Sequence, residues 1–154
     1  MKKLIIPFIL LLNVACHPST VFEKYEELPE ENWNRYKVIE FTTSIPDSGL
    51  YNLTLNIRHT TDYEMANLWC FLSTRSQAEK QLKDTINIKI AEPDGRWLGK
   101  GGTIKTIEQN INRNPVFLPQ GEVKIRIEQG MRLEDMKGIK NVGIKIEKAE
   151  EIKG

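Results

Sequence analysis

The chain has 154 residues, in which 22 lysines and arginines oppose 21 aspartates and glutamates, so the formal net charge is +1 at pH 7. No block of basic residues occurs, and this balance excludes the charge pattern of a nucleic-acid-binding protein. The length is sufficient for one domain with a sizeable hydrophobic core.

The first 15 residues have the three parts of a secretory signal peptide. Lys2 and Lys3 supply the positive start, residues 4–12 are apolar, and Val14-Ala15 form a small-residue cleavage zone. The apolar run has only nine residues, whereas a membrane-spanning helix needs roughly 20. We therefore predict a targeting segment over residues 1–15 that takes no part in the fold.

Cys16 follows the cleavage zone directly, as in bacterial lipoprotein signals, where the thiol accepts a diacylglycerol. We predict lipidation of Cys16, which anchors the mature protein in a membrane because two or more acyl chains hold stably. Asn13 departs from the usual pattern, which has Leu three residues before the Cys. The alternative is an ordinary cleaved signal with an incidental cysteine. Residues 17–21 are expected to form a flexible tether.

Alternation of apolar and polar residues, typical of half-buried strands, dominates residues 22–154, which we expect to form a single domain. Residues 68–72 are continuously apolar, which is typical of a central strand buried on both faces. We expect a loop over residues 26–34 and short helices over residues 76–82 and 133–136. In chain order, the expected strands cover residues 21–25 (an edge strand), 38–42, 51–58, 68–72, 85–90, 115–118, 123–127 and 142–146.

Proline and glycine separate these segments at short intervals, in turns such as Pro46-Asp47-Ser48-Gly49 and Pro93-Asp94-Gly95. About eight or nine strands in one domain predict an all-β fold, an antiparallel two-sheet sandwich of jelly-roll type with minor helix. The inward-facing row is expected to consist of Leu53, Leu55, Ile57, Ile86, Ile88, Ile125, Ile127, Ile144 and Ile146.

No catalytic motif occurs in the sequence. It lacks a nucleophile elbow, a His-Glu-x-x-His pair and a plausible Ser–His–Asp set, so we expect neither an enzyme nor a cofactor. Cys70 lies in an apolar run and is expected to be a small buried side chain rather than a catalytic thiol. Asp84, Glu92 and Asp94 lack the spacing of a calcium loop, so no metal is expected. Residues 99–102 are rich in glycine but lack phosphate-loop spacing, and we expect a mobile or tightly turned loop.

Three tryptophans bear on carbohydrate binding, because sugar rings stack on exposed aromatic side chains. Trp69 lies within the expected central strand and is predicted to belong to the core, where Trp supplies a large buried area. Trp97 follows a turn and Trp33 lies in the early loop, so these two are candidates for contact with a ligand.

Several motifs follow one another in a specific order. They are Asp62-Tyr63, Asp94-Gly95-Arg96-Trp97-Leu98-Gly99-Lys100-Gly101, Gln129-Gly130-Met131-Arg132-Leu133, Gly138-Ile139 and Val142-Gly143-Ile144, with shorter pieces such as Ile57-Arg58. Through them the chain resembles the gliding-motility lipoprotein H family of the Bacteroidetes over residues 21–147. The resemblance implies a small lipoprotein needed, with other envelope proteins, for surface gliding, a process coupled to a dedicated protein-secretion system. Relatives also occur in species that do not glide, and no catalytic residue comes with the resemblance.

The tether indicates which membrane face the protein occupies. Surface-exposed lipoproteins of this phylum resemble one another in an acidic run just after the Cys. Here no acid stands between Cys16 and Glu23, and position 17 lacks the Asp that commonly retains lipoproteins in the inner membrane. We therefore expect an outer-membrane anchor with the domain facing the periplasm.

Two motif regions, residues 94–101 and 129–143, do not resemble ordinary strands. Both are rich in glycine and charge, and loops at the ends of a sandwich often carry function. One interpretation is that they are specialised connections that plug the end of the core. The other is a recognition surface for an envelope partner, because Arg and Trp are frequent interface hot spots. The residues of that candidate surface are Arg96, Trp97, Lys100 and Arg132.

Two functions remain open at this point. The first is a scaffold or assembly factor that binds envelope proteins of the gliding or secretion machinery. The second is a carbohydrate- or peptidoglycan-binding lipoprotein. An exposed row of aromatic residues on one sheet face would favour a sugar, whereas an exposed apolar patch or a long open edge would favour a protein.

The substitution Cys16→Ser tests the anchor. It should block lipidation and release the protein from membranes, because the apolar run is too short to hold the chain alone. Fractionation of cells grown with a labelled fatty acid measures both effects. Label retained by the Cys16→Ser protein would contradict lipidation at this position.

Overall fold

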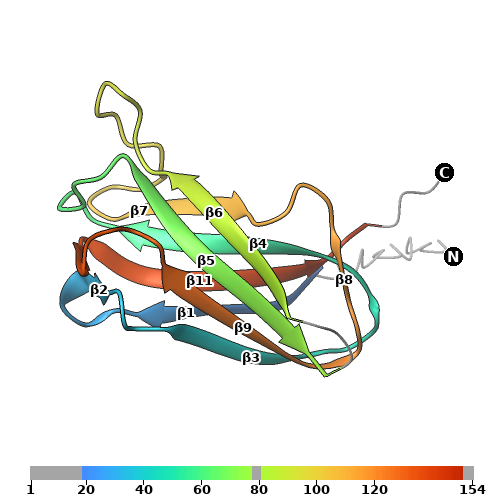
Figure 1. The fold of residues 1–154 in the computed structure, drawn as a ribbon. Helices are drawn as coiled ribbons and strands as arrows, with labels where there is room; N and C mark the ends of the chain where they lie inside the picture. The colour runs from blue at the N-terminus through green and yellow to red at the C-terminus, as the bar shows by residue number, and fades with distance from the viewer. Residues whose placement is uncertain (1–18, 78–80, 151–154) are drawn as a thin grey trace, which may run out of the picture.

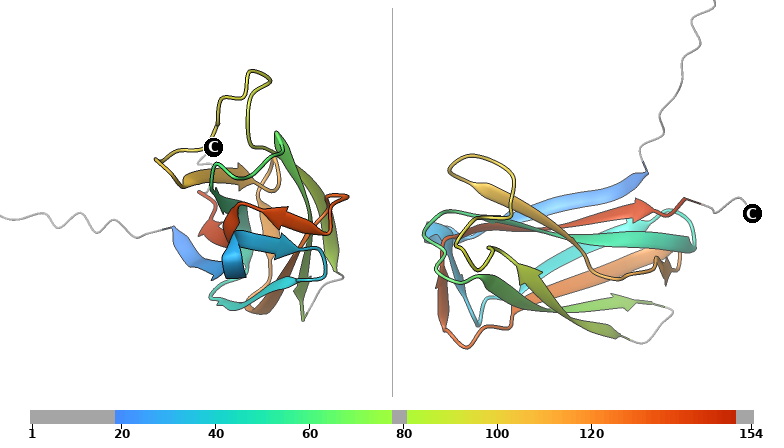
Figure 2. Two further views of the ribbon diagram at one scale, coloured as in Figure 1. Left: turned by 90° about the vertical axis from the view of Figure 1, so that its left-hand side faces the viewer. Right: turned by 90° about the horizontal axis from the view of Figure 1, so that it is seen from above.

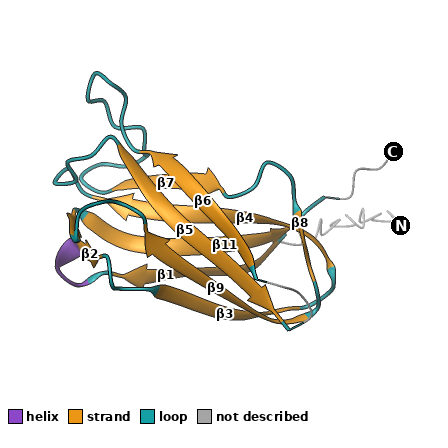
Figure 3. Cartoon of the chain, in the orientation of Figure 1, coloured by secondary structure: helices purple, strands orange, loops and turns teal. Residues whose placement is uncertain are grey.

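The structure is a computed structural model that describes residues 19–77 and 81–150. The expected signal peptide and Cys16 lie outside the described residues. Within them, strands dominate and the single helical element is one short turn (Figure 3). The elements are β1 (Thr20–Glu27), η1 (Pro29–Glu31, a 3-10 turn), β2 (Asn32–Asn34), β3 (Ile39–Ile45), β4 (Gly49–His59), β5 (Asn67–Ser76), β6 (Leu82–Lys89), β7 (Lys105–Asn110), β8 (Val116–Leu118), β9 (Gly121–Gln129), β10 (Asp135–Lys137) and β11 (Ile139–Lys148).

Two antiparallel sheets pack face to face (Figures 1 and 2). The first has the strand order β1-β11-β4-β7, and the short β8 also pairs with β4. The second has the order β3-β9-β5-β6. Strands β2 and β10 form a separate two-stranded ladder.

The strand pairing is that of a jelly roll. If the three-residue strands β2, β8 and β10 are left aside, the first remaining strand pairs with the last, the second with the seventh, the third with the sixth and the fourth with the fifth. This nesting arises when one long hairpin is rolled into two sheets. The predicted all-β antiparallel sandwich is therefore confirmed.

The core lies between the two sheets and is built by the alternation seen in the sequence. All nine residues of the predicted inward row are buried, and the most exposed of them, Ile86, shows only 6% of its surface. Each of these strands turns its polar residues to the opposite face, as a period of two requires. Cys70 is also fully buried, as predicted.

Strand β5 corrects two expectations. It lies inside its sheet between β9 and β6, but only one of its faces is buried. Leu68 and Leu72 point into the core, while Trp69 and Phe71 point outward with 39% and 49% of their surface exposed. The prediction that Trp69 belongs to the core was wrong, because apolar residues on both faces of a strand conceal which face is buried.

The expected loop over residues 26–34 is also wrong. Strand β1 continues through Glu27, and η1 then leads directly into β2. Trp33 of β2 is fully buried and pairs with Met136 of β10, which is also buried. The indole nitrogen of Trp33 donates a hydrogen bond to the carbonyl of Lys37 at 3.0 Å. These two apolar side chains close one end of the sandwich, which explains why the local sequence forms a ladder there.

The two expected helices are not supported by the described residues. Residues 133–136 lead into β10 instead of a helix, because Met136 is drawn into the ladder with β2. In the segment 76–82, Ser76 ends β5 and Leu82 begins β6, while its middle lies outside the described residues. No helix in the described part of the chain is long and apolar enough to cross a bilayer.

The chain enters and leaves the sandwich at the same end. The amide of Lys148 donates to the carbonyl of Ser19 at 2.8 Å, so the start of β1 lies beside the end of β11. We call this the proximal end. The opposite, distal end carries the connections from β1 to β2, β4 to β5, β6 to β7 and β9 to β11 (Figures 1 and 2).

Truncation of a core side chain should test the sandwich energetically. Ile125→Ala removes a fully buried side chain from the middle of β9 and is expected to lower the free energy of unfolding by about 2–5 kcal/mol. The control is Lys124→Ala, whose side chain is 61% exposed and which should change stability by about 0.5 kcal/mol or less. Urea denaturation compares the two, and equal losses would contradict the assigned inward face of β9.

Candidate functional site

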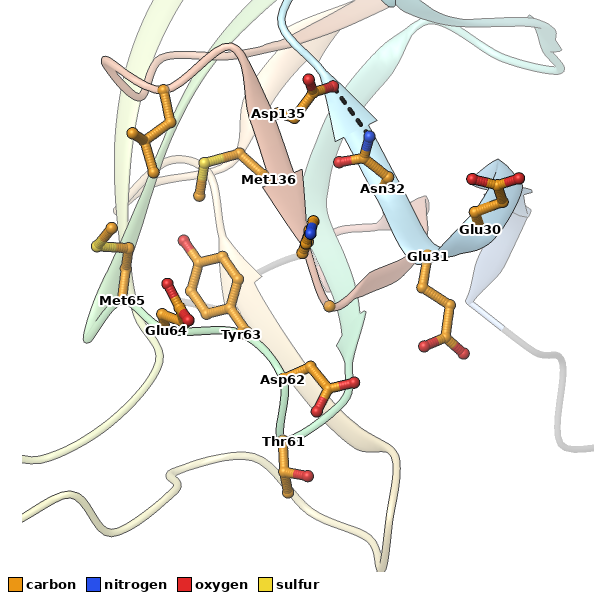
Figure 4. Close-up of a pocket in the computed structure, with 13 residues that line it drawn as sticks. Glu30, Glu31, Asn32, Thr61, Asp62, Tyr63, Glu64, Met65, Asp135 and Met136 are labelled. Carbon is orange, nitrogen blue, oxygen red and sulfur yellow. Dashed lines mark hydrogen bonds between the residues drawn. The ribbon is translucent and has the colours of Figure 1, made fainter.

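A hollow of about 760 Å³ opens at the distal end of the sandwich, where η1, the β4–β5 connection and β10 meet (Figure 4). Its rim carries five carboxylates and one ammonium group. Its apolar lining comes from one tyrosine, two methionines and a leucine. The lining residues are Glu30, Glu31, Asn32, Thr61, Asp62, Tyr63, Glu64, Met65, Leu133, Asp135, Met136, Lys137 and Gly138. We call this site the acidic hollow.

Two of the rim carboxylates stand on an unusual backbone. Glu30 and Glu31 have φ angles of 54° and 53°, in the left-handed region that residues other than glycine rarely adopt. The turn is held because the buried Leu28 donates its amide to the carbonyl of Lys140 at 2.8 Å and accepts from the amide of Glu31 at 3.1 Å. Figure 4 shows Glu30 and Glu31 on one side of the hollow and Glu64 on the other.

A third rim carboxylate is locked by two asparagines. The side-chain amides of Asn34 and Asn32 each donate to Oδ1 of Asp135 at 2.9 Å, across the β2–β10 ladder. These hydrogen bonds lower the pKa of Asp135, because they stabilise the ionised carboxylate. The rim therefore keeps this negative charge at neutral pH.

The floor of the hollow depends on a glycine. Gly138 has φ +84°, and a Cβ there would collide with the backbone of Tyr63. Its carbonyl accepts a hydrogen bond from the amide of Thr60 at 2.8 Å. The Asp62-Tyr63 and Gly138-Ile139 motifs, 76 positions apart in the printed sequence, thus meet at this contact. The tyrosine is buried, which raises its pKa, and its hydroxyl donates to the carbonyl of Asn67 at 2.8 Å.

A second feature lies on the outer face of the β3-β9-β5-β6 sheet, where Trp69 and Phe71 are exposed. The amide of Gly130 donates to the carbonyl of Trp69 at 2.7 Å, and a Cβ at Gly130 would stand 3.1 Å from the Phe71 ring. The amide of Trp69 donates to Sδ of Met131 at 3.2 Å. The motif Gln129-Gly130-Met131 therefore seats the two aromatic side chains. We call Trp69, Phe71 and Met131 the aromatic patch.

The loop after β9 joins the aromatic patch to the acidic hollow. Gln129 is 6% exposed, and its amide donates to the carbonyl of Leu133 at 3.0 Å while its Oε1 accepts from the amide of Met131 at 2.8 Å. One end of this loop touches Trp69, and Leu133 at the other end lines the hollow. The two features thus share one buried glutamine as their support.

A smaller groove of about 450 Å³ continues from the patch along the same sheet face. Its side chains are mostly polar or charged, apart from Phe71 and Leu72. The others are Ser73, Gln81, Lys83, Asp84, Thr85, Arg126 and Glu128.

The structure places three of the four predicted surface residues on the connection between β6 and β7. Arg96 is exposed beside Asp94, with 3.9 Å between Nε and Oδ2, and Lys100 is exposed in a backbone bridge to Thr106. Trp97 is half-buried, with its ring centroid 5.0 Å from that of His59. Arg132 stands apart from them, exposed in the loop after β9. None of the four lines the acidic hollow or the groove.

Burial favours the neutral forms of two titratable groups in the interior, Cys70 and His59. Burial raises the pKa of the Cys70 thiol, which keeps it protonated and unreactive. Burial also lowers the pKa of His59, whose Nδ1 donates to the carbonyl of Thr60 at 2.9 Å. Among residues 19–77 and 81–150 there is no group of three or more His, Cys, Asp and Glu side chains arranged to hold a metal.

The sequence alone did not reveal the acidic hollow or the aromatic patch. Its acids come from three segments, Glu30-Glu31, Asp62–Glu64 and Asp135, and none of these segments is an acidic motif. The only sequence signal was indirect, because the Asp62-Tyr63 and Gly138-Ile139 motifs turned out to be in contact.

Comparison with known proteins gives consistent matches over nearly the whole chain. A family model described as GldH lipoprotein matches residues 20–146. A protein of Christiangramia forsetii named "Gliding motility lipoprotein GldH homolog" is 30% identical over 152 residues, covering 93% of each chain. The "Gliding motility lipoprotein GldH" of Flavobacterium johnsoniae is 29% identical over 146 residues, covering 89% of this chain and 90% of the relative.

Solved structures match only distantly. A family 35 carbohydrate binding module from Clostridium thermocellum is 18% identical, covers 70% of this chain and 68% of its own, and has a TM-score of 0.41.

The contact between the two motifs can be tested at Gly138. Gly138→Ala should cost about 3–4 kcal/mol, because it adds a collision with the Tyr63 backbone to the cost of a left-handed alanine, about 1–2 kcal/mol. Gly95→Ala is the matched control, since Gly95 has nearly the same φ, +85°, but nothing within 4 Å of the added Cβ. Urea denaturation of both variants separates the two contributions, and equal losses would show that the close approach to Tyr63 does not matter.

Proposed function

The chain belongs to the GldH lipoprotein family, and from this premise we propose that it is a non-enzymatic scaffold or assembly factor of the gliding and secretion machinery. Membership of a lipoprotein family makes it a membrane-anchored protein of the cell envelope. The proposal adds that the lipid is carried by Cys16, and that the anchor sits in the outer membrane with the domain facing the periplasm. The tether without an early acid supports that location.

The exposed aromatic patch is the observation that carries the scaffold role. Phe71 shows 49% of its surface and Trp69 shows 39%, although both stand on an inner strand of a sheet. Aromatic residues and methionine are enriched in the cores of protein interfaces, where a few such side chains carry most of the binding energy. Met131 beside them adds a side chain that adapts its shape to a partner.

The acidic hollow indicates the chemistry of the partner. Five carboxylates against Lys137 leave the rim negative, and its apolar lining includes Met65, Leu133 and Met136. A segment that presents lysine or arginine next to an apolar side chain would complement both properties. We propose that the partner is a protein with a basic segment of this kind, which occupies the hollow while a neighbouring surface covers the aromatic patch.

The four residues predicted from the sequence extend this proposal. Arg96, Lys100 and Arg132 are exposed on connections at the distal end, and Trp97 braces the β6–β7 connection against His59. We propose that the three basic side chains contact the partner outside the hollow. The arrangement then offers positive charge at the periphery and negative charge at the hollow, a pattern that would restrict the orientation of the partner.

Binding of a glycan or of peptidoglycan is the second candidate function. Two aromatic residues spaced two apart on one exposed sheet face offer a stacking surface for sugar rings. The adjoining groove carries hydroxyl and charged groups, from Ser73, Thr85 and Glu128 among others, that can form hydrogen bonds with sugar hydroxyls. We rank this function second because it gives no role to the acidic hollow or to Met131.

Substitution of Phe71 tests the proposed interface. Phe71→Ala should weaken capture of envelope proteins by the lipidated protein, in detergent extracts of its own cells, by about tenfold or more, which corresponds to about 1.4 kcal/mol. Phe117→Ala is the matched control. Phe117 is equally exposed, at 49%, but it lies on β8, away from the aromatic patch. Both variants should keep the melting temperature of the parent within a few degrees.

The result distinguishes the two functions. Loss of the same envelope protein from Phe71→Ala and from the double variant Asp62→Lys/Glu64→Lys, with capture retained by Phe117→Ala, supports a partner with a basic segment. Unchanged capture by Phe71→Ala, together with lost binding to purified peptidoglycan, would replace the scaffold with the glycan function.

A further inference from the structure

Two large apolar side chains lie opposite each other at the proximal end of the sandwich. Leu50 of β4 and Phe117 of β8 are partners in the antiparallel ladder and are 53% and 49% exposed. Their chain neighbours Tyr51 and Leu118 are buried, so the alternation of the strands directs Leu50 and Phe117 to the outer face of the sheet. We call Leu50 and Phe117 the apolar pair.

The surface around the apolar pair is polar, so the pair does not extend an apolar sheet face. The next outward residue on β4, Asn52, is exposed and stands opposite Glu147 of β11. Thr20 donates a hydrogen bond from its hydroxyl to Oε1 of Glu147 at 3.2 Å. Core packing therefore gives no reason for a leucine and a phenylalanine at these two positions.

The pair lies at the same end of the sandwich as the start of the described chain, with the end of β11 between Ser19 and Leu50. The amide of Ala149 donates to the carbonyl of Leu50 at 2.9 Å, and the amide of the preceding Lys148 donates to the carbonyl of Ser19 at 2.8 Å. Two consecutive residues of the chain, Lys148 and Ala149, thus connect the backbone of Ser19 with that of Leu50 through one hydrogen bond each. Ser19 follows Cys16 by three positions, a length of chain that spans at most about 11 Å when fully extended.

This short span brings the proximal end of the sandwich within reach of the bilayer surface. The argument rests on lipidation of Cys16, which is part of the proposed function. A lipid held in one leaflet keeps Ser19 within about 11 Å of the Cys16 backbone, while the headgroup layer of each leaflet is itself about 5–7 Å thick. Side chains at the proximal end, those of Leu50 and Phe117 included, are therefore close enough to reach that layer when the domain tilts toward it.

Charged groups at the proximal end are compatible with such a contact. Lys148 is half-exposed, and its Nζ lies 3.8 Å from Oδ2 of the exposed Asp47. Arg113, in the connection that leads to β8, is exposed as well. Lysine and arginine at this level can bind lipid phosphates while neighbouring apolar side chains enter the headgroup region.

We infer that the apolar pair inserts into the lipid headgroup region next to the acyl anchor and so fixes the orientation of the sandwich on the membrane. A lipid at the end of a short tether leaves the domain free to tilt and rotate, and a second contact removes most of that freedom. With the proximal end held down, the acidic hollow at the other end of the sandwich points away from the bilayer toward its partner.

Site-directed spin labelling of the lipidated full chain tests the contact. The protein is reconstituted in vesicles of phosphatidylethanolamine and phosphatidylglycerol at a ratio of about 3:1, a composition with the negative surface that attracts basic side chains. A nitroxide is attached at Phe117→Cys, or at the matched position Phe71→Cys, which is equally exposed but lies on the opposite sheet. The buried Cys70 and the lipidated Cys16 should not react with the label.

Collision with oxygen compared with a water-soluble nickel complex then reports the depth of each label. We expect the ratio of oxygen to nickel accessibility to be several-fold higher at position 117 than at position 71. Equal ratios at the two positions would overturn the inference, and so would spin–spin broadening at position 117, which would identify a second copy of the chain as the occupant. Flotation of the protein with the vesicles is scored separately, because a protein that fails to float contradicts the lipid anchor instead.

A charged double variant tests the effect on orientation. Leu50→Asp/Phe117→Asp changes only exposed side chains and should keep the parent melting temperature and its flotation with vesicles. Energy transfer from a dye at Lys137→Cys to a dye in the bilayer should show one narrow distance distribution in the parent and a broader one, shifted to shorter distances, in the double variant. Identical distributions would overturn the orienting role.

Discussion

The pairing of β11 with both β1 and β4 is the constraint on which the rest of the structure depends. One face of β11 buries Val142, Ile144 and Ile146 in the core. On its other face, Gly143 leaves room for the ring of Tyr25 from the neighbouring strand β1, with which a Cβ at this position would collide. That ring is in turn held from β4, because Asn56 donates to its hydroxyl at 3.1 Å and the Arg58 guanidinium lies 4.0 Å from its centroid. Three strands distant in sequence are thereby joined on both faces.

This pairing also determines where function can reside. By bringing the last strand beside the first, it places the chain entry at one end and gathers the irregular connections at the other. The proposed lipid on Cys16 would hold the proximal end at the membrane, so a partner in the proposed periplasmic location would meet the distal end, where the acidic hollow lies. In this proposal the apolar pair contacts the membrane and the aromatic patch contacts the partner, although Phe117 and Phe71 are equally exposed.

The family motifs have a structural meaning that differs from direct recognition. Gly138 and Gly143 are positions where another chain segment comes too close for a side chain, and a Cβ at Gly130 would crowd the Phe71 ring. Gln129 organises its loop from a buried position with hydrogen bonds to that loop's backbone. These residues support the proposed binding surface from beneath, whereas the exposed side chains that would touch a partner, such as Phe71 and Leu133, depend on them for their placement.

The sequence by itself determined the all-β class and the nine inward residues, because a period of two in Leu, Ile and Val shows directly which face a strand buries. The jelly-roll type was predicted from the number of strands, and the strand pairing confirmed it. The sequence could not determine the exposed face of β5, where Trp69 and Phe71 made both faces apolar. It also gave no indication of β7, whose residues Lys105–Asn110 are mostly half-buried without a clear alternation.

The acidic hollow was decided by tertiary structure alone. Its carboxylates come from segments around residues 30, 62 and 135, and only the rolled hairpin, with Gly138 against Tyr63, brings them to one rim. Local patterns encode how a strand faces the core, whereas contacts between distant segments depend on chain topology, which no local pattern records.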